Sequence, residues 1–405
     1  MPWKETCAMD ERLMFISECL LGELPMTALC ERFGISRKTG YKWLERYRDD
    51  AESGLLERSR VPHHCANGLA DEVAERILAL RRRHPYYGPR KLLAQLERLH
   101  PAQRWPAAST IGDLLRREGL SERRRRRASG VPVTRPFSTV AAPNDVWCAD
   151  FKGWFRTADG SRCDPLTISD AHSRFLLDCK IVAPTTEGTE PRFVRAFREF
   201  GLPQALRTDN GPPFASTGAG GLSRLSVKWV KLGIRLERID PGAPQQNGRH
   251  ERLHRTLKEQ TSQPPAATPK SQQRRFDRFR RHYNCERPHE ALDQETPASR
   301  YTASPRPYPE RIEEPWYDAD HAVRRVRSSG EIKWGGELIF VSEALIGEPV
   351  GIAETADGDW IVRFADIDLG VINRQTKKLR RFAAPRPGRR KAQHAGKTVT
   401  HVSGL

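Results

Sequence analysis

The stretch "DVWCADFKGWF" (residues 145–155) marks the point where helical patterning gives way to strand patterning. It alternates between apolar and polar residues and is rich in types that favour strands, so it predicts a β-strand. Asp150 lies in its middle, and a carboxylate there must point off one face of a sheet. Two further strands are expected close behind, in "RCDPLTISD" (162–170) and "RFLLDCKIV" (174–182).

Downstream, helices alternate with strands. A helix is expected in "GTEPRFVRAFREFG" (188–201), a short strand in "PQALRTDNG" (203–211), and then another helix and strand before "PGAPQQNGRHERLHRTLKEQ" (241–260). This last stretch begins as a loop and continues as a helix, with Leu253 and Leu257 on one face. The resulting β-β-β-α-β-α-β-α order predicts one mixed sheet flanked by helices.

Three carboxylates belong to separate elements of this predicted domain. Asp150 is in the first strand, Asp209 ends a later strand at a turn, and Glu251 opens the final helix, with separations of 59 and 42 residues. Clustered carboxylates repel one another unless cations neutralise them, and Mg²⁺ prefers oxygen ligands. We therefore expect the three to converge on two Mg²⁺ ions, with Mn²⁺ as a possible substitute. Two such ions about 4 Å apart suit an in-line phosphoryl displacement.

The final helix also carries cations that suit a DNA backbone. Arg255 and Lys258 follow Glu251 by four and seven residues, so all three share one helix face. Gln246 and Asn247, in the loop before the helix, are expected to touch DNA near the same place. The pattern explains why one acid stands among many bases.

These motifs carry a family resemblance. "VWCADFKGWF", "LRTDNGPPF" and "PQQNGRHERLHRTLK", followed by "YNCERPHEALDQETPASRY", resemble the catalytic core of the DDE-type insertion-sequence transposases. That core is shared with retroviral integrases and has an RNase H-like fold. The resemblance extends over roughly residues 10–300, and the three motifs in this order are a specific signal. The 42-residue spacing is longer than is usual in related enzymes, with the excess in the loop "STGAGGLSRLS".

The resemblance implies roles for particular residues. It implies that the three carboxylates form the metal-binding triad: Asp150, Asp209 and Glu251. It further implies that Asn210 and Gly211 shape the turn after the second aspartate, and that Lys258 contacts terminal DNA.

The N-terminal region predicts a helix-turn-helix. Helices are expected in residues 11–22 and 26–35, and Ser36 can cap a third in "SRKTGYKWLERYR" (36–48). The start of the third helix is basic, as in helices that enter the major groove by their N-terminal end. Gly40 inside that helix costs up to about 1 kcal/mol relative to alanine and counts mildly against the assignment. The expected DNA contacts are Arg37, Lys38, Thr39 and Lys42.

The fold class we predict is multidomain α+β: N-terminal helix-turn-helix units, an RNase H-like mixed α/β core and a small C-terminal β-rich barrel. A second, winged-type helical DNA-binding unit ends in an arginine run that includes Arg123, Arg124 and Arg125. The predicted domains are residues 1–60 (helix-turn-helix), 61–128 (second helical unit), 129–143 (linker), 144–305 (catalytic core), 318–376 (β-barrel) and 377–405 (disordered basic tail).

Composition narrows the class of partner. The formal net charge is +18, from 69 Lys and Arg against 51 Asp and Glu, which indicates a polyanion such as nucleic acid. Eight cysteines without paired spacing predict a reducing, intracellular (cytoplasmic, nucleoid-associated) location. The run His63-His64-Cys65 is interpreted as a loop, so no zinc is expected. Neither a signal peptide nor an apolar run of spanning length is present, and no membrane partner is expected.

Other acids and histidines near the triad are given structural roles. Four further aspartates surround Asp150 and could be mistaken for it, namely Asp145, Asp164, Asp170 and Asp178, and turn chemistry accounts for the first three. Glu237 and Glu259 are interpreted as surface salt-bridge partners. His250 and His254 flank Glu251, and we expect them to contact phosphate or lie on the surface.

Together these features predict a transposase that binds terminal inverted repeats and performs metal-dependent strand cleavage and strand transfer. Its partners would be double-stranded DNA, both transposon ends and target, and further copies of the chain in a dimer or tetramer. Two alternatives remain open: a DNA-binding regulator with an inactive core, and a structure-specific nuclease of the same fold.

Overall fold

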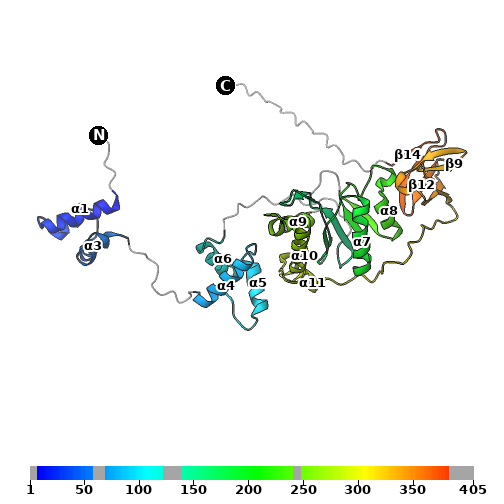
Figure 1. Cartoon of the computed structure of the whole chain (residues 1–405). Coiled ribbons are helices and arrows are strands. Elements are labelled where there is room, and N and C mark those ends of the chain that lie inside the picture. The colour runs from blue at the N-terminus through cyan, green and yellow to red at the C-terminus, as the bar shows by residue number, and fades with distance from the viewer. Residues whose placement is uncertain (1–6, 58–68, 122–138, 240–247, 383–405) are drawn as a thin grey trace, which may run out of the picture. The chain divides into compact units, whose positions relative to one another are not determined.

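The computed structural model describes residues 7–57, 69–121, 139–239 and 248–382 (Figure 1). The arginine run, the loop with Gln246 and Asn247, His63-His64-Cys65 and the tail beyond residue 382 lie outside the described residues. The chain separates into two compact units, Met1–Asp71 and Glu72–Leu405.

The first unit contains the three predicted helices. These are α1 (Ala8–Leu21), α2 (Met26–Arg32) and α3 (Arg37–Asp50), followed by the 3-10 helix η1 (Ala51–Leu55). As predicted, the Ser36 hydroxyl caps α3 by accepting a hydrogen bond from the backbone N–H of Thr39 at 3.2 Å. Phe15, Leu29 and Trp43, one from each helix, meet in a single buried cluster. Burial of one apolar stripe from each helix is what stabilises so small a unit.

Gly40 has a packing role in this unit. A Cβ built on Gly40 would lie 2.7 Å from Sγ of Cys30 and 3.0 Å from Cζ of Phe15. The glycine therefore lets α3 approach α1 and α2 closely, which outweighs its low helix propensity.

The second unit begins with three more helices: α4 (Asp71–Arg83), α5 (Pro89–Leu99) and α6 (Ala108–Arg117). They contact the domain that follows. The Tyr87 hydroxyl is 3.1 Å from Nε2 of His282, and Arg90 pairs with Glu290 at 2.7 Å. Tyr87 is 1% exposed, so the contact is part of a packed interface.

The central sheet has the strand order β5-β4-β1-β6-β7. Its strands are β1 (Val146–Phe151), β4 (Pro165–Asp170), β5 (Leu176–Ile181), β6 (Ala205–Thr208) and β7 (Arg235–Arg238). Strands β5, β4 and β1 are antiparallel, whereas β6 and β7 extend the sheet in parallel from β1. A short hairpin of β2 (Phe155–Arg156) and β3 (Arg162–Cys163) is additional to the predicted strands.

Helices cover both faces of this sheet, which confirms the predicted mixed α/β core (Figure 1). One face packs on α7 (Thr186–Phe200) and α8 (Arg224–Lys231) through a cluster that includes Trp147, Phe193 and Trp229. The other packs on α9 (Gly248–Thr261) and α10 (Pro269–Cys285) through Leu253, Leu257 and Phe276. After α10 come η4 (Glu290–Leu292) and α11 (Pro297–Arg300).

The predicted C-terminal β-rich domain is present. A five-stranded antiparallel sheet has the order β14-β13-β12-β11-β8, and β9 and β10 form a separate ribbon. The bounds are β8 (Ala322–Arg325), β9 (Glu331–Trp334), β10 (Glu337–Phe340), η5 (Glu343–Leu345), β11 (Pro349–Glu354), β12 (Trp360–Phe364), β13 (Ile367–Ile372) and β14 (Leu379–Arg381).

The long loop between the second aspartate and Glu251 packs against this C-terminal domain. It includes η2 (Ala219–Gly221), and Ala219 and Leu222 are fully buried in the same apolar cluster as Leu369 of β13. The guanidinium of Arg238 donates to the Gly221 carbonyl at 2.7 Å, which holds the loop against β7. The extra length therefore forms a docking element and leaves the strand with the second aspartate undisturbed.

Candidate active site

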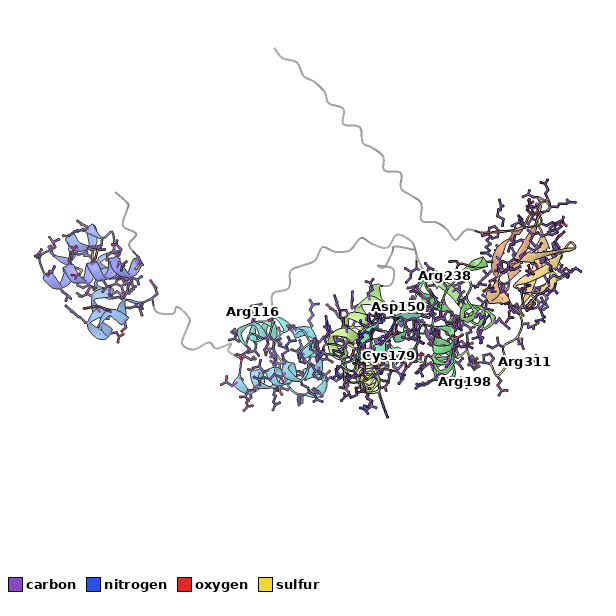
Figure 2. All side chains as sticks on the ribbon, turned by 45° about the horizontal axis from the view of Figure 1, so that its top comes forward. Arg116, Asp150, Cys179, Arg198, Arg238 and Arg311 are labelled. Atoms are coloured by element: carbon purple, nitrogen blue, oxygen red, sulfur yellow. The ribbon has the colours of Figure 1, made fainter. Side chains whose placement is uncertain are left out.

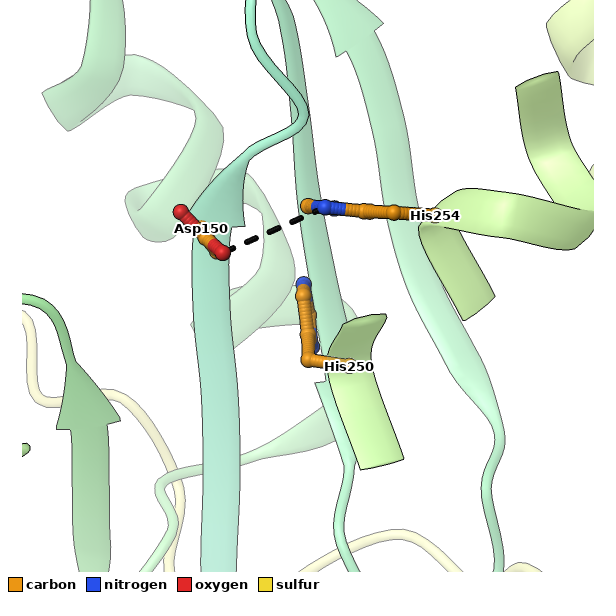
Figure 3. Close-up of side chains that lie close together, drawn as sticks. All are labelled: Asp150, His250 and His254. Carbon is orange, nitrogen blue, oxygen red and sulfur yellow. Dashed lines mark ion pairs between the residues drawn. The ribbon is translucent and has the colours of Figure 1, made fainter. Parts of the chain in front are cut away.

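Asp150, labelled in Figure 2, lies near the end of β1, and its carboxylate lies beside the histidines of α9 (Figure 3). In the antiparallel pair of β1 and β4 its Cα partner is Thr167. Directly opposed residues project from the same face of a sheet, so both side chains point toward α9. Trp147 and Ala149 alternate to the opposite face and pack in its apolar cluster. The period of two along β1 thus sets the direction of the carboxylate.

Asp209 follows the last residue of β6, the strand that pairs in parallel with β1. Its Oδ1 accepts a hydrogen bond from the Gly211 N–H at 3.3 Å. Asn210 donates from Nδ2 to the Ile239 carbonyl at 2.5 Å, which ties the turn to the segment just after β7. Burial raises the pKa of Asp209 above its ordinary value, and the Gly211 N–H opposes that change.

Glu251 is an exposed residue in the first turn of α9. Its charge reaches Asp150: burial, then the charge of Asp209, and to a smaller extent that of Glu251, raise the pKa of Asp150 to about 7. A like charge raises the pKa of a carboxyl group when it acts through a poorly solvated region. The charges of Asp209 and Glu251 thus act on Asp150, but in the part of the chain that the structure describes these two acids are not in the group of donor atoms that lie within 4.8 Å of one another at Asp150.

His250 and His254 do not lie on the surface, contrary to the sequence-based interpretation. His250 is 1% exposed, and its Nε2 is 2.6 Å from the Thr167 hydroxyl. His254 Nε2 is 2.7 Å from the same hydroxyl, and its Nδ1 is 3.9 Å from Oδ2 of Asp150 (Figure 3). One donor atom from each of Asp150, His250 and His254 falls within 4.8 Å of the others, a grouping that could hold a metal ion.

The sequence contains a signal for this arrangement. His250, Leu253, His254 and Leu257 recur at the spacing of one helix stripe, so the two histidines share the buried face with the two leucines. Glu251 with Arg255 and Lys258 forms the adjacent stripe, which is exposed. Including the two histidines in the apolar stripe would have predicted that they pack against the sheet.

Lys152 is a residue of the site that sequence reasoning missed. It comes two positions after Asp150, and its charge acts on His254. Burial and the neighbouring charge of Lys258 lower the pKa of Lys152. Two ammonium groups close enough to repel one another beside three carboxylates provide cations where a DNA phosphate would approach the acids.

The remaining predicted DNA contacts are exposed where the structure describes them. Arg37, Lys38 and Lys42 of α3 are exposed and Thr39 is half-buried. The Lys42 ammonium lies 4.2 Å from the centroid of the Trp43 ring.

The other acids have structural partners. Oδ2 of Asp145 accepts hydrogen bonds from the Ala141 and Ala142 backbone N–H groups. Buried Asp170 accepts bonds from the Asn144 N–H at 2.8 Å and from Ser173 at 2.6 Å. Asp164 pairs with Arg162 and Asp178 with Arg192.

Glu237 differs from the sequence-based interpretation because it is buried. It is 8% exposed and accepts two hydrogen bonds from Arg207, which is 6% exposed. Both residues belong to the parallel strands β6 and β7, and Arg207 stands two positions before Asp209. The pair stabilises the strand edge from which Asp209 projects.

A cation-rich cleft of about 890 Å³ lies where α5 and α9 approach the segment after α10. Its lining includes Lys91, Arg252 and Arg287. Burial, then the charges of Arg287 and Arg252, lower the pKa of Lys91 to about 8. Arg287 is 8% exposed and its Nη1 has no hydrogen-bond partner among the described residues. Gathered, poorly solvated cations of this kind favour an anionic occupant.

Family models match the chain in the order of its domains. Integrase core domain models match residues 140–244 and 232–297. A helix-turn-helix domain model matches residues 11–63, and a homeodomain-like domain model matches residues 39–115.

Two curated relatives are proteins of insertion elements. The insertion element IS407 uncharacterized 31.7 kDa protein of Burkholderia multivorans is 30% identical over 283 residues, covering 67% of this chain and 93% of that protein. The insertion element IS476 uncharacterized 39.2 kDa protein of Xanthomonas euvesicatoria is 30% identical over 231 residues, covering 56% and 63% of the two chains.

Among solved structures, the HTLV-2 integrase catalytic core domain in complex with magnesium is similar at 17% identity and a TM-score of 0.32, covering 40% of this chain and 98% of that one. In the part of the chain that the structure describes, every helix is too short or too polar to cross a membrane. Integrase-core and helix-turn-helix models match successive parts of the chain, and the IS407 protein is similar over nearly all of its length. The chain therefore belongs to the integrase-type transposases of bacterial insertion elements, within the DDE-type nucleotidyl transferase superfamily.

Proposed function

We propose that this protein is a DNA transposase that cuts the ends of its own element and joins them to target DNA. The observation that carries the proposal is the setting of Asp150 at the end of β1, where burial and then the charges of Asp209 and Glu251 raise its pKa to about 7. A carboxylate in such a setting is costly when charged, and a bound cation makes the charged form favourable. Family membership supports this use of the site.

The donor set fits divalent metal. The carboxylates on β1, in the turn after β6 and in the first turn of α9 belong to one packed domain, whose sheet and helix would position them. Asp150 and Asp209 would hold such ions from the sheet, and Glu251 from the helix. When bound, divalent ions supply activation of the attacking oxygen and stabilisation of the leaving oxygen.

The chain's own residues would position the DNA. In the first reaction water attacks the phosphorus at the element's end, the P–O3′ bond breaks, and a free 3′-hydroxyl is left. In the second, that hydroxyl attacks a target phosphodiester and displaces the target's own 3′-oxygen, which takes up the proton. Lys152, Arg255 and Lys258 surround the acids with cations that can hold the phosphate backbone in line.

Separate surfaces would provide recognition. The exposed bases at the start of α3 suit the major groove of the terminal repeats, and the cleft lined by Lys91, Arg252 and Arg287 suits a length of phosphate backbone. Two element ends must be joined in one event, so we also propose that the active form is a dimer or tetramer on DNA.

The test gives the full chain a labelled terminal-repeat oligonucleotide, a target plasmid and either Mg²⁺ or Mn²⁺. We expect cleaved and joined products from the natural sequence and a loss of at least about a thousandfold in D150N, D209N and E251Q, because each variant removes a charged oxygen ligand. D164N is the matched control, since Asp164 pairs with Arg162 at the domain's surface and lies outside the site. Specific binding without cleavage would indicate a regulator, and cleavage without joining would indicate a nuclease.

A further inference from the structure

The buried stripe of α9 places two imidazoles beside the first carboxylate. His250 and His254 are one turn apart, and their rings lie 4.6 Å apart, edge to face. Both point at one hydroxyl, that of Thr167, from distances of 2.6 and 2.7 Å. Nε2 of each ring therefore faces Thr167, and Nδ1 is the nitrogen on the other side of each ring.

The Thr167 hydroxyl has three hydrogen-bond partners. It donates to the Asp150 backbone carbonyl at 3.2 Å, and its oxygen also lies beside Nε2 of both imidazoles. A neutral ring whose Nε2–H donates to that oxygen presents a lone pair on Nδ1.

The two Nδ1 atoms have different surroundings. That of His250 is 3.3 Å from the Ser169 hydroxyl, which can donate to it. That of His254 faces Oδ2 of Asp150 at 3.9 Å. A charge-assisted N–H···O bond would close to about 2.8 Å, so this gap does not correspond to a protonated Nδ1 bonded to the carboxylate. Instead, two electron-pair donors face one another.

We propose that Nδ1 of His254 is a ligand of the divalent ion that Asp150 holds. Metal–nitrogen and metal–oxygen bonds of about 2.1 Å each sum to about 4.2 Å, so a gap of 3.9 Å admits one ion in a bent arrangement. The Thr167 hydroxyl accepts the Nε2–H and fixes the ring, as the outer partners of metal-bound histidines do. The inference rests on the proposed function, because Asp150 must first bind metal.

A nitrogen ligand changes which metal the site prefers. Mg²⁺ favours all-oxygen sites, whereas imidazole suits transition ions such as Mn²⁺, Co²⁺ and Zn²⁺. The ion at Asp150 is therefore expected to be Mn²⁺ or another transition ion in preference to Mg²⁺. His250, with both nitrogens occupied by Thr167 and Ser169, has a positioning role and is not a ligand.

The experiment loads the full chain with Mn²⁺ and records its electron spin-echo modulation, which detects ¹⁴N bonded to the metal. We expect one imidazole coupling in the natural sequence, its loss in H254Q and its retention in H250N, the matched variant one turn away. Competition binding should show the preference for Mn²⁺ over Mg²⁺ falling at least about tenfold in H254Q alone.

The possible outcomes separate the two proposals. Mn²⁺ that binds in the natural sequence and is lost in D150N, yet shows no ¹⁴N coupling, overturns the role of His254 and leaves the proposed function standing. Mn²⁺ binding that D150N leaves unchanged overturns both. The measurement on the natural sequence needs no variant, so the inference remains testable even if H254Q fails to fold.

Discussion

Thr167 stands directly opposite Asp150 across β1 and β4, and its hydroxyl is the common partner of His250 and His254. The hydroxyl thereby links the strand with the first carboxylate to the helix with the third. Substituting valine keeps the shape but leaves two imidazole nitrogens without the hydroxyl that they face. Each lost partner costs about 1–3 kcal/mol.

We therefore expect T167V to lower the free energy of unfolding by about 2–5 kcal/mol, whereas T167S, which keeps the oxygen, should lower it by less than about 1.5 kcal/mol. Denaturant titration of both variants measures this. Equal stability of T167V and T167S would show that the hydroxyl does not hold the two rings.

Buried neutral histidines predict loss of stability in mild acid. Burial is the main cause that lowers the pKa of His250 to about 3, that of His254 to about 2 and that of His289 to about 3. Below pH 6.5 these histidines therefore bind protons in the unfolded chain but not in the folded chain. Asp150 acts in the opposite direction, because its raised pKa lets the folded state hold a proton between about pH 4 and 7. The lowered pKa of His84 adds to the loss and the raised pKa of Asp209 adds to the gain, and the four histidines outweigh the two aspartates.

The net effect is a stability that falls as pH drops from about 6.5 toward 3, by a few kcal/mol between pH 6.5 and 5. Thermal unfolding across this range tests it. H289N should take up about one fewer proton on unfolding, so its stability should fall less steeply as the pH drops. A melting temperature that stays constant or rises from pH 6.5 to 5 is incompatible with three neutral buried rings.

Gly40 predicts an unusual response to alanine. In an exposed helix, G40A would add up to about 1 kcal/mol of stability, but here the new Cβ meets Cys30 Sγ at 2.7 Å inside the cluster of the first unit. Overpacking typically costs about 1–3 kcal/mol. We expect G40A to lower the protection of α1–α3 amides from hydrogen exchange in the full chain. The double variant C30A/G40A removes the clashing sulfur and should restore most of it; a stabilised G40A would contradict the packing argument.

The buried pair Arg207–Glu237 predicts a strongly non-additive pair of substitutions. R207M removes both hydrogen bonds to the Glu237 carboxylate, which is 8% exposed and keeps a long ion pair with Arg235 at 3.9 Å, at a cost of up to about 3–5 kcal/mol. R207M/E237L removes both charges and should recover most of that loss. Because Arg207 precedes Asp209 by two residues, R207M should also weaken Asp209-dependent metal binding. Additive losses in the double-mutant cycle would indicate that the two side chains do not depend on each other.

The sequence alone predicted the order of the elements and three candidate carboxylates. Alternation around Asp150, the turn after Asp209 and the helix stripe around Glu251 are local patterns, set by the two-residue period of strands and the 3.6-residue period of helices. Such local patterns can be recognised without knowing which residues pack against them. This is why the mixed sheet and the N-terminal helices could be predicted.

The tertiary structure decided what each face contacts. No local pattern shows that Thr167 lies opposite Asp150, that His254 points at the same carboxylate, or that Glu237 is buried on Arg207. The sequence likewise indicated where the Gly-rich loop lies in the chain but not what it contacts. In the structure, Ala219 and Leu222 of this loop pack in the core of the C-terminal domain. Strand register and helix docking bring together residues that are dozens of positions apart in the sequence. The free energy that favours these contacts comes from the burial of apolar surface, which only the assembled sheet provides.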